Sequence, residues 1–297
     1  MFKKMRWALP ALSLLAACAS ASPPPPKAPP ARPALWKVSD ADTTIYLFGT
    51  IHVLRKDFQW RTPAINKAVQ RSRELVLEVN DLQDKDATAK TFLKLAISPG
   101  LPPVLDRVPP DKRAGLEALM EKAGMSGPAL NQFESWAVAV TLASGLLKDL
   151  DVSPDYGVEK QLQATFAKSK KPVSGLETTE LQLGLFDKLP ESAQRAFLSS
   201  MVDDSVDPAK EFNDMVSAWS KGDDTAIAAS FDDEFKRSPE LAQSLLYNRN
   251  ANWKTWVEKR LKQPGTVFVA VGAGHLAGPD SVVAMLAKEK VKVERIQ

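Results

Sequence analysis

Two apolar runs, each closed by a glycine and a histidine, constrain this chain more than any other feature of its sequence. One run covers 44–48 and leads into Gly49–His52; the other covers 266–271 and leads into Gly272–His275. Runs of this length predict buried strands, and open α/β sheets bind ligands beyond the carboxyl ends of their strands. No other histidines occur in the 297 residues. If the two strands are neighbours, both imidazoles meet in one site.

The start of the chain predicts export. Lys3, Lys4 and Arg6 precede an apolar run over 7–17, which is too short for a membrane span of about 20 residues. The run ends at Cys18 in the pattern of a bacterial lipobox, in which the cysteine is lipidated. An ordinary signal sequence with an incidental cysteine is the alternative. We therefore expect a signal peptide over the first 17 residues and lipidation at Cys18.

Residues 18–34 are expected to form a proline-rich tether after the lipidated cysteine. Seven prolines lie within 19–33, and this composition favours an extended, polyproline-like chain. Ala19 and Ser20 carry no acidic signal for the inner membrane. The expected location is therefore the bacterial cell envelope, lipid-anchored at the outer membrane and facing the periplasm.

Charge and length constrain the part of the chain beyond the tether. The formal net charge of +3 includes three basic residues of the signal segment, without which 36 basic residues balance 36 acidic ones. A neutral domain without a basic stripe argues against nucleic acid as a partner. Residues 35–297 contain no second linker or fixed-period repeat, so they predict a single domain.

Strand patterns lie at both ends of this domain and helical patterns fill its middle. Strands are predicted at 35–38, 44–48, 75–79, 172–176, 266–271 and 291–295. Helices are predicted at 62–73, 84–96, 110–123, 132–147, 155–168, 279–288 and over 178–263 with breaks at Pro190, Pro208, Gly222 and Pro239. The fold class is therefore α/β (α+β): a central mixed sheet with strands from both termini and a large helical insertion.

Two glutamates end predicted strands and are candidates to join the histidines. Two imidazoles and a carboxylate, with a position left open for water, make a hydrolytic metal site. Glu78 is the stronger candidate, because an ionised carboxylate at the end of an apolar strand is costly to bury without a partner. A solvent-facing position on an alternating strand is the alternative for Glu78. Glu177 is the second candidate, and the histidines themselves can also be structural.

Polar residues on predicted helices are weaker candidates. Arg249 can hold a substrate carboxylate or stabilise an oxyanion, and Asn250 follows it directly. Asp155 and Glu159 stand at a predicted helix start, where acids complement the helix dipole. We expect these two acids to be solvated.

The combined pattern resembles the TraB/GumN family, which is related to the Tiki membrane-tethered proteases and the bacterial pheromone-shutdown proteins. It consists of the two Gly-x-x-His phrases, Leu-Glu-Val at 77–79, Gly-Leu-Glu-Thr at 175–178, Arg-Asn at 249–250 followed by Trp253, and Val-Gly-Ala-Gly-His-Leu at 271–276. The resemblance spans nearly all of 35–297.

This resemblance implies a site and an activity. His52, His275 and Glu78 are its core residues, with Glu177, Arg249 and Asn250 lining the pocket. Tiki relatives are described as divalent-metal proteases. The expected function is thus a membrane-tethered, metal-dependent hydrolase of peptides or proteins that uses Mn, Co or Zn. One of Glu78 and Glu177 would be a ligand and the other a general base.

More distant relatives suggest two alternatives. Erythromycin esterases and an iron-regulated haem lipoprotein resemble the same architecture. The chain can therefore be a metal-independent esterase that uses histidine and glutamate. It can also be a non-catalytic surface lipoprotein that binds haem or a metal complex through the same histidines.

Overall fold

A computed structural model describes residues 30–297 apart from 82–83, 126 and 203–206. The predicted signal peptide, the lipidation at Cys18 and most of the tether lie outside these residues. From Ala31 to Gln297 the chain forms one compact unit. Among the described residues, no helix is both long and apolar enough to cross a membrane.

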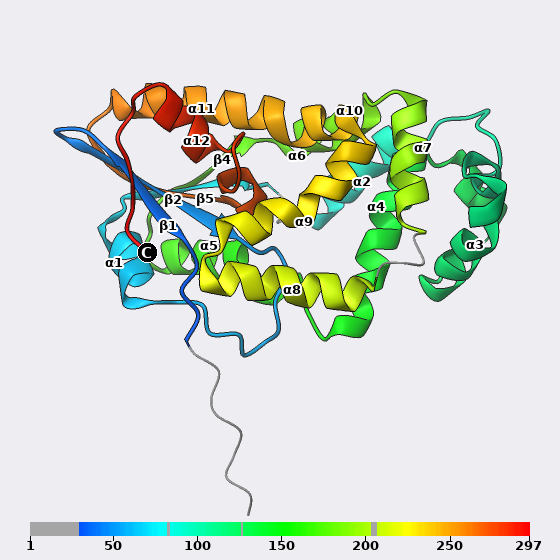
Figure 1. Ribbon diagram of the computed structural model, residues 1–297, viewed down its shortest axis with the longest axis horizontal. Coiled ribbons are helices and arrows are strands. Elements are labelled where there is room, and N and C mark those ends of the chain that lie inside the picture. The colour runs from blue at the N-terminus through cyan, green and yellow to red at the C-terminus, as the bar shows by residue number, and fades with distance from the viewer. Residues whose placement is uncertain (1–29, 82–83, 126, 203–206) are drawn as a thin grey trace, which may run out of the picture. The chain divides into compact units, whose positions relative to one another are not determined.

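A six-stranded mixed sheet forms the centre of this unit (Figure 1). Its strands are β1 (Leu35–Ser39), β2 (Thr43–Thr50), β3 (Glu74–Val79), β4 (Val173–Glu177), β5 (Gly265–Gly272) and β6 (Val293–Arg295). In the order β4-β3-β5-β2-β1-β6, the first four strands are parallel, and β1 pairs antiparallel with both β2 and β6. The predicted mixed sheet with strands from both termini is confirmed.

The predicted neighbourhood of the two histidine-bearing strands is also confirmed. β2 and β5 pair in parallel from Thr43 opposite Gly265 to Thr50 opposite Gly272. Because parallel strands end at the same edge of a sheet, the two Gly-x-x-His phrases leave it side by side. The predicted strands at 35–38 and 44–48 form an antiparallel hairpin around the turn at Asp40–Asp42.

Helices form close to the predicted positions. They are α1 (Pro63–Arg71), α2 (Lys85–Ala96), α3 (Arg113–Lys122), α4 (Ser135–Leu146), α5 (Val158–Lys168), α6 (Thr179–Asp187), α7 (Glu191–Ser200), α8 (Pro208–Lys221), α9 (Asp224–Arg237), α10 (Pro239–Ala242), α11 (Asn248–Leu261) and α12 (Val282–Lys288). The breaks predicted at Pro190, Pro208, Gly222 and Pro239 all separate helices. Thr62 caps α1 as expected, accepting a hydrogen bond from the backbone N–H of Ile65.

The helix predicted over 155–168 is wrong at its start. A short 3₁₀ turn covers Pro154–Tyr156, and α5 begins only at Val158. Gly157 separates the two with extended backbone, at φ −58° and ψ 154°. This break decides where the acidic side chains near it point.

Alternating side chains of the strands pack against helices on both faces of the sheet. Tyr46, Phe48 and Phe268 belong to a core cluster with residues of α1 and α5. On the other face, residues such as Leu47 and Val269 form a cluster with residues of α11 and α12. The helices α1 and α5 therefore cover one face, and α11 and α12 cover the other.

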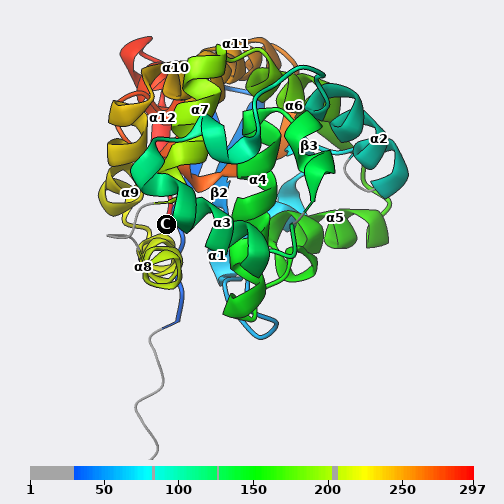
Figure 2. The ribbon, with the colours of Figure 1, turned by 90° about the vertical axis from the view of Figure 1, so that its right-hand side faces the viewer.

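Part of the predicted helical insertion stands at one end of the sheet. Figure 1 shows α3, α4 and α7 to the right of the strands, and Figure 2, seen from that side, shows them in front of the strands. Residues 136–147 carry no charged side chain, and α4 buries Trp136, Val138 and Leu142.

Candidate active site

Strand ends bring four of the predicted residues to one edge of the sheet. His52 follows β2, Glu78 lies near the end of β3, Glu177 is the last residue of β4, and His275 lies in a 3₁₀ turn after β5. Together with Arg249 of α11, three of them (His52, Glu78 and His275) line one cavity of about 600 Å³. Glu177 does not line it.

Glu78 is a buried carboxylate with several donors, not an exposed strand residue. Its Oε1 accepts from the backbone N–H of Gly272 at 2.5 Å, and its Oε2 accepts from Arg249 Nη2 at 2.6 Å and Gln182 Nε2 at 3.1 Å. Burial raises the pKa of Glu78. Electrostatic interactions with His275, Arg249 and His52, together with the Gly272 N–H, outweigh burial and lower that pKa to about 2. Glu78 is therefore ionised at neutral pH.

Arg249 links the acidic and imidazole groups of the site. All five of its N–H groups are hydrogen-bonded. The Glu177 carboxylate accepts from Nε and from Nη2, and Glu78 accepts the second hydrogen of Nη2. The two hydrogens of Nη1 go to the carbonyl oxygen of Leu245 and to His275 Nε2. In this conformation no N–H of Arg249 is left for a substrate. The sequence prediction had assigned Arg249 to a substrate carboxylate or an oxyanion.

Glu177 lies behind the arginine. Besides its bonds to Arg249, its Oε1 accepts from Trp253 Nε1 at 3.0 Å, and its side chain is 6% exposed. The guanidinium of Arg249 stacks over the Trp253 ring, 4.6 Å from its centroid. A π-helical turn over Gln243–Tyr247 precedes α11, and such turns are frequent at functional sites. Glu177 thus positions Arg249.

His275 is buried and held in one neutral tautomer. Its Nε2 lies 3.0 Å from Arg249 Nη1, which can only donate, so Nε2 accepts and Nδ1 carries the proton. Nδ1 donates to Asn250 Oδ1 at 2.6 Å, and Asn250 Nδ2 donates to the carbonyl oxygen of Asp280. Burial and the Arg249 charge lower the pKa of His275 to about 3, despite Glu78. Asn250, predicted to line the pocket, instead orients this imidazole.

His52 has the opposite surroundings. Its side chain is 66% exposed and faces the cavity, while its Nδ1 lies 2.7 Å from Glu159 Oε1. Removal from bulk water lowers the pKa of His52, but the Glu159 carboxylate outweighs this and raises it to about 9. His52 is therefore protonated at neutral pH. Among the described residues its Nε2–H has no hydrogen-bond partner, so it is available within the cavity.

Glu159 corrects the expectation of a solvated first turn. Its carboxylate bonds both His52 and the hydroxyl of Thr50 and is only 20% exposed, whereas Asp155 is exposed as predicted. A Cβ at Gly157 would overlap the carbonyl oxygen of His52. Glycine is thus required there for α5 to approach β2 and present Glu159. Glu159 and Gln182 are the site residues that the sequence did not indicate.

Gly272 keeps the centre of the site open. A Cβ built there would lie 3.0 Å from Glu78 Oε1, 3.6 Å from His52 Nε2 and 3.7 Å from His275 Cδ2. Two imidazoles and a carboxylate therefore surround one small space. Its size suits a water molecule or a carbonyl oxygen.

The donor set for the metal implied by the resemblance is blocked by Arg249. Its guanidinium is bonded to both His275 Nε2 and Glu78 Oε2, two atoms that a metal would need. In the described part of the chain, no group of three or more His, Cys, Asp or Glu side chains is placed to hold a metal ion. The residues as arranged do not fit a divalent ion.

Comparison with known proteins gives a family match and distant relatives. The TraB/PrgY/gumN family matches residues 34–295. The chain is 24% identical over 241 residues to the uncharacterized protein YbaP of Escherichia coli K12, covering 81% of this chain and 87% of YbaP. It is equally similar to YbaP of Shigella flexneri. No solved structure matches.

Proposed function

The chain belongs to the TraB/PrgY/gumN family, and we propose that it is a hydrolase of ester or amide bonds that activates water with His52 and Glu78. One observation carries this proposal. An ionised carboxylate and a protonated imidazole face one open space beside Gly272, inside a cavity. Groups whose environments drive their pKa values apart are suited to base and acid roles.

The roles follow from the free atoms. Glu78 Oε1 has one lone pair beyond its bond to Gly272 and takes a proton from water as that water attacks the substrate carbonyl. His52 Nε2–H protonates the leaving group, while Glu159 holds the imidazole through Nδ1. Arg249 keeps Glu78 ionised and His275 neutral. The hydroxide of the water becomes part of the carboxylic acid product. The proton that Glu78 took from the water then passes through solvent to His52 and replaces the one given to the leaving group, so both side chains return to their starting states.

Glu78→Gln tests the base role. The change keeps size and a carbonyl oxygen but removes the charge, so turnover of p-nitrophenyl acetate and of a peptide panel should fall by about 10²–10⁴-fold. The domain should stay folded, because an amide is cheaper to bury than a carboxylate. Glu74→Gln, at the other end of β3, is the matched control. Wild-type turnover in Glu78→Gln would remove Glu78 from the mechanism.

A divalent-metal peptidase is the second candidate, supported by the outer contacts of the imidazoles. Both Nδ1 atoms are held by oxygen acceptors, Glu159 and Asn250, which is the usual arrangement behind metal-binding histidines. A divalent-metal site here requires the hydrogen bond between Arg249 Nη1 and His275 Nε2 to break. Metal analysis of the purified protein beside His52→Ala separates the candidates. Bound Mn, Co or Zn that disappears in the variant favours the peptidase, and a Soret shift with haemin favours the haem-binding alternative.

Attachment to a membrane through Cys18 would place this hydrolase at the bacterial envelope. The lipobox pattern supports it. Cys18→Ser should abolish palmitate labelling and membrane fractionation while the domain stays folded, since the described domain begins beyond this residue. Unchanged labelling of the variant would contradict the anchor.

A further inference from the structure

The cavity of the proposed active site is divided sharply by chemistry. The polar side chains among its described lining residues come from the strand ends, α6 and α11: Thr50, His52, Glu78, Gln182, Arg249 and His275. Every other described lining residue is glycine, alanine or a larger apolar residue. The site therefore has a reactive end and a long hydrocarbon end.

Phenylalanines from four helices form much of the hydrocarbon end. Phe186, Phe197 and Phe212 come from α6, α7 and α8, and Phe231 and Phe235 come from α9, where their rings stack 5.9 Å apart. Several of these side chains are only partly buried. They thus present apolar surface to the cavity, while Phe186, Phe197 and Phe231 also pack against core residues.

This division points to one class of substrate. We propose that the enzyme hydrolyses esters or amides of long-chain fatty acids, with the acyl carbonyl beside Gly272 and the chain among the phenylalanines. This inference rests on the proposed hydrolase. Water bonds to the acyl carbon, the bond to the leaving oxygen or nitrogen breaks and that atom takes a proton. A free fatty acid is the other product.

A hydrocarbon chain fits this lining better than a peptide does. Each buried peptide group that finds no hydrogen-bond partner costs about 2–7 kcal/mol. The helices of the wall use their own backbone groups, and the described apolar wall offers no polar side chain. The 600 Å³ volume corresponds to about 20 groups the size of water, enough for a long alkyl chain.

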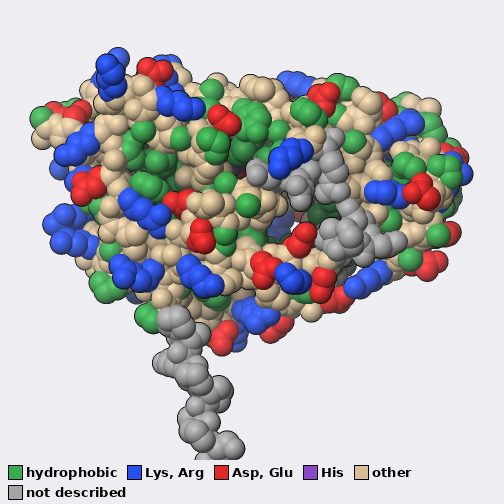
Figure 3. Space-filling model, in the orientation of Figure 1, with side chains coloured by type: hydrophobic (Ala, Val, Ile, Leu, Met, Phe, Trp, Pro, Cys, Tyr) green, Lys and Arg blue, Asp and Glu red, His purple; other side chains and the backbone are tan. Residues whose placement is uncertain are grey.

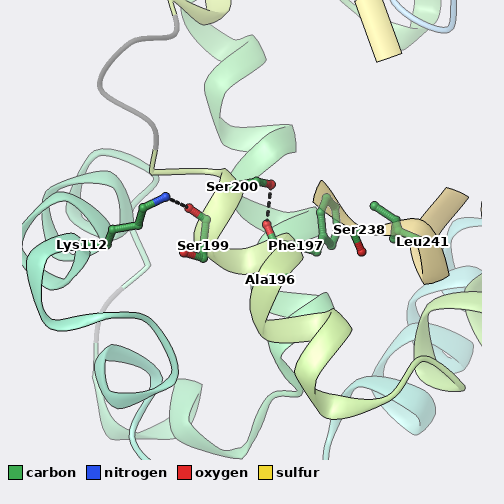
Figure 4. A pocket seen from close by; sticks show the side chains of 7 residues that line it. All are labelled: Lys112, Ala196, Phe197, Ser199, Ser200, Ser238 and Leu241. Atoms are coloured by element: carbon green, nitrogen blue, oxygen red, sulfur yellow. Dashed lines mark hydrogen bonds between the residues drawn. The ribbon is translucent and has the colours of Figure 1, made fainter. Parts of the chain in front are cut away.

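A smaller hollow next to α7 adds no separate site. It has a volume of about 180 Å³ and shares Phe197 and Leu241 with the large cavity. In Figure 4, Lys112 donates to the carbonyl oxygen of Ser199, and the Ser200 hydroxyl donates to that of Phe197. These polar groups are committed to backbone partners.

The face of the molecule shown in Figure 3 has no large patch of like charge for a charged macromolecule. Figure 3 shows basic and acidic side chains interspersed over the visible face, without a patch of a single sign. This agrees with the balanced charge of the domain. The apolar cavity is thus the strongest indication of what the protein binds.

Chain length provides the test. The purified protein is assayed for hydrolysis of p-nitrophenyl acetate, butyrate, octanoate and laurate, and laurate binding is measured by displacement of fluorescent parinaric acid. Each methylene that enters the cavity should raise kcat/KM about fourfold, or about 10²-fold from butyrate to octanoate. Laurate should displace the probe from wild type and from His52→Ala alike.

Two variants shorten the cavity, and one is a control. Leu246→Trp and Leu147→Trp, from different helices of the lining, should lower the laurate-to-butyrate ratio of kcat/KM at least tenfold. Leu93→Trp changes an exposed residue outside the cavity and should leave the ratio unchanged. Using two variants guards against one that fails to fold.

The outcomes separate this inference from the proposed activity. If laurate binds but no ester is hydrolysed, the proposed hydrolase activity is wrong and the acyl-chain site stands. Hydrolysis that is indifferent to chain length, with no laurate binding, would leave the hydrolase and overturn the acyl-chain site. Displacement of the probe by an apolar peptide or by haemin, but not by laurate, would also overturn it.

Discussion

The ends of β2 and β5 carry the same phrase and pair in register, yet their histidines are in opposite states. His52 is exposed to the cavity beside the Glu159 carboxylate, which raises its pKa to about 9. His275 is buried beside the Arg249 guanidinium, and its pKa is lowered to about 3. One imidazole is therefore a proton donor at neutral pH, and the other is a neutral hydrogen-bond acceptor. The charge of the neighbour, rather than the local sequence, assigns the role.

Removing each imidazole in turn should separate chemistry from stability. His52→Ala should lower turnover by about 10²–10⁴-fold with little change in melting temperature, because this side chain is exposed. His275→Ala leaves Arg249 and Asn250 short of a partner, so it should destabilise the domain by about 1–3 kcal/mol. Turnover and chemical denaturation of both variants provide the measurement. If His52→Ala and His275→Ala changed stability equally, the proposed difference in role between the two histidines would be wrong.

Arg249→Met should remove the charge that keeps His275 neutral and so distinguishes it from His52. It leaves the Glu78 and Glu177 carboxylates buried without their partner, which costs about 3–5 kcal/mol of unfolding free energy. Without the guanidinium, the pKa of His275 should rise. Arg260→Met is the control, since Arg260 also lies on α11 and binds a glutamate, Glu74, but at a more exposed position. Its expected cost is at most about 1 kcal/mol, and an equal cost for both variants would contradict the account.

Stability should depend on pH through both imidazoles, in opposite directions. His275 has a lower pKa folded than the 6.5 of an unfolded chain, so its contribution is full above pH 6.5 and is lost as pH falls towards 3. His52 has a higher pKa folded, so its contribution is full below pH 6.5 and is lost as pH rises through 9. Unfolding free energy should therefore peak near pH 6.5.

The two limbs can be assigned by variants. His275→Gln should flatten the acid limb between pH 4.5 and 6.5, a window chosen because Glu78 begins to contribute only below 4.5. His52→Gln should flatten the alkaline limb, because it removes the group whose pKa is raised in the folded state. An acid limb that persists in His275→Gln would show that another group titrates there.

The sheet and the meeting of the histidines were predictable because both depend on local patterns and a general rule. Apolar runs ending in glycine mark β2 and β5, and parallel strands share an edge. Glu78 could be chosen on the same reasoning. The helix boundaries within the insertion were predictable in the same way, from its prolines and a glycine.

The roles around the histidines were not predictable, because they depend on contacts between distant segments. Glu159 was expected to be solvated, and only the approach of Gly157 to the His52 backbone brings it to the imidazole. Arg249 was expected to bind substrate, but its partners come from β3, β4 and the turn after β5. The phenylalanines of the cavity follow helical spacing and, in sequence, are indistinguishable from core residues.

Of these substitutions, Glu159→Gln should change the structure least and still alter the difference in pKa between His52 and His275. The amide keeps a hydrogen-bond acceptor for His52 but removes the charge that raises its pKa. The pKa of His52 should fall, and that of His275 should stay where it is. An unchanged His52 pKa would mean that Glu159 is not the cause of its charge state.

Because only two histidines occur in the chain, a ¹³C- and ¹⁵N-histidine NMR titration reads both states directly. With His52→Gln to assign the signals, the account predicts that His52 titrates near pH 9. It predicts that His275 remains neutral, with its proton on Nδ1, down to at least pH 4.5. If both imidazoles titrated near pH 6.5, they would be equivalent, and the division of acid and acceptor roles would be wrong.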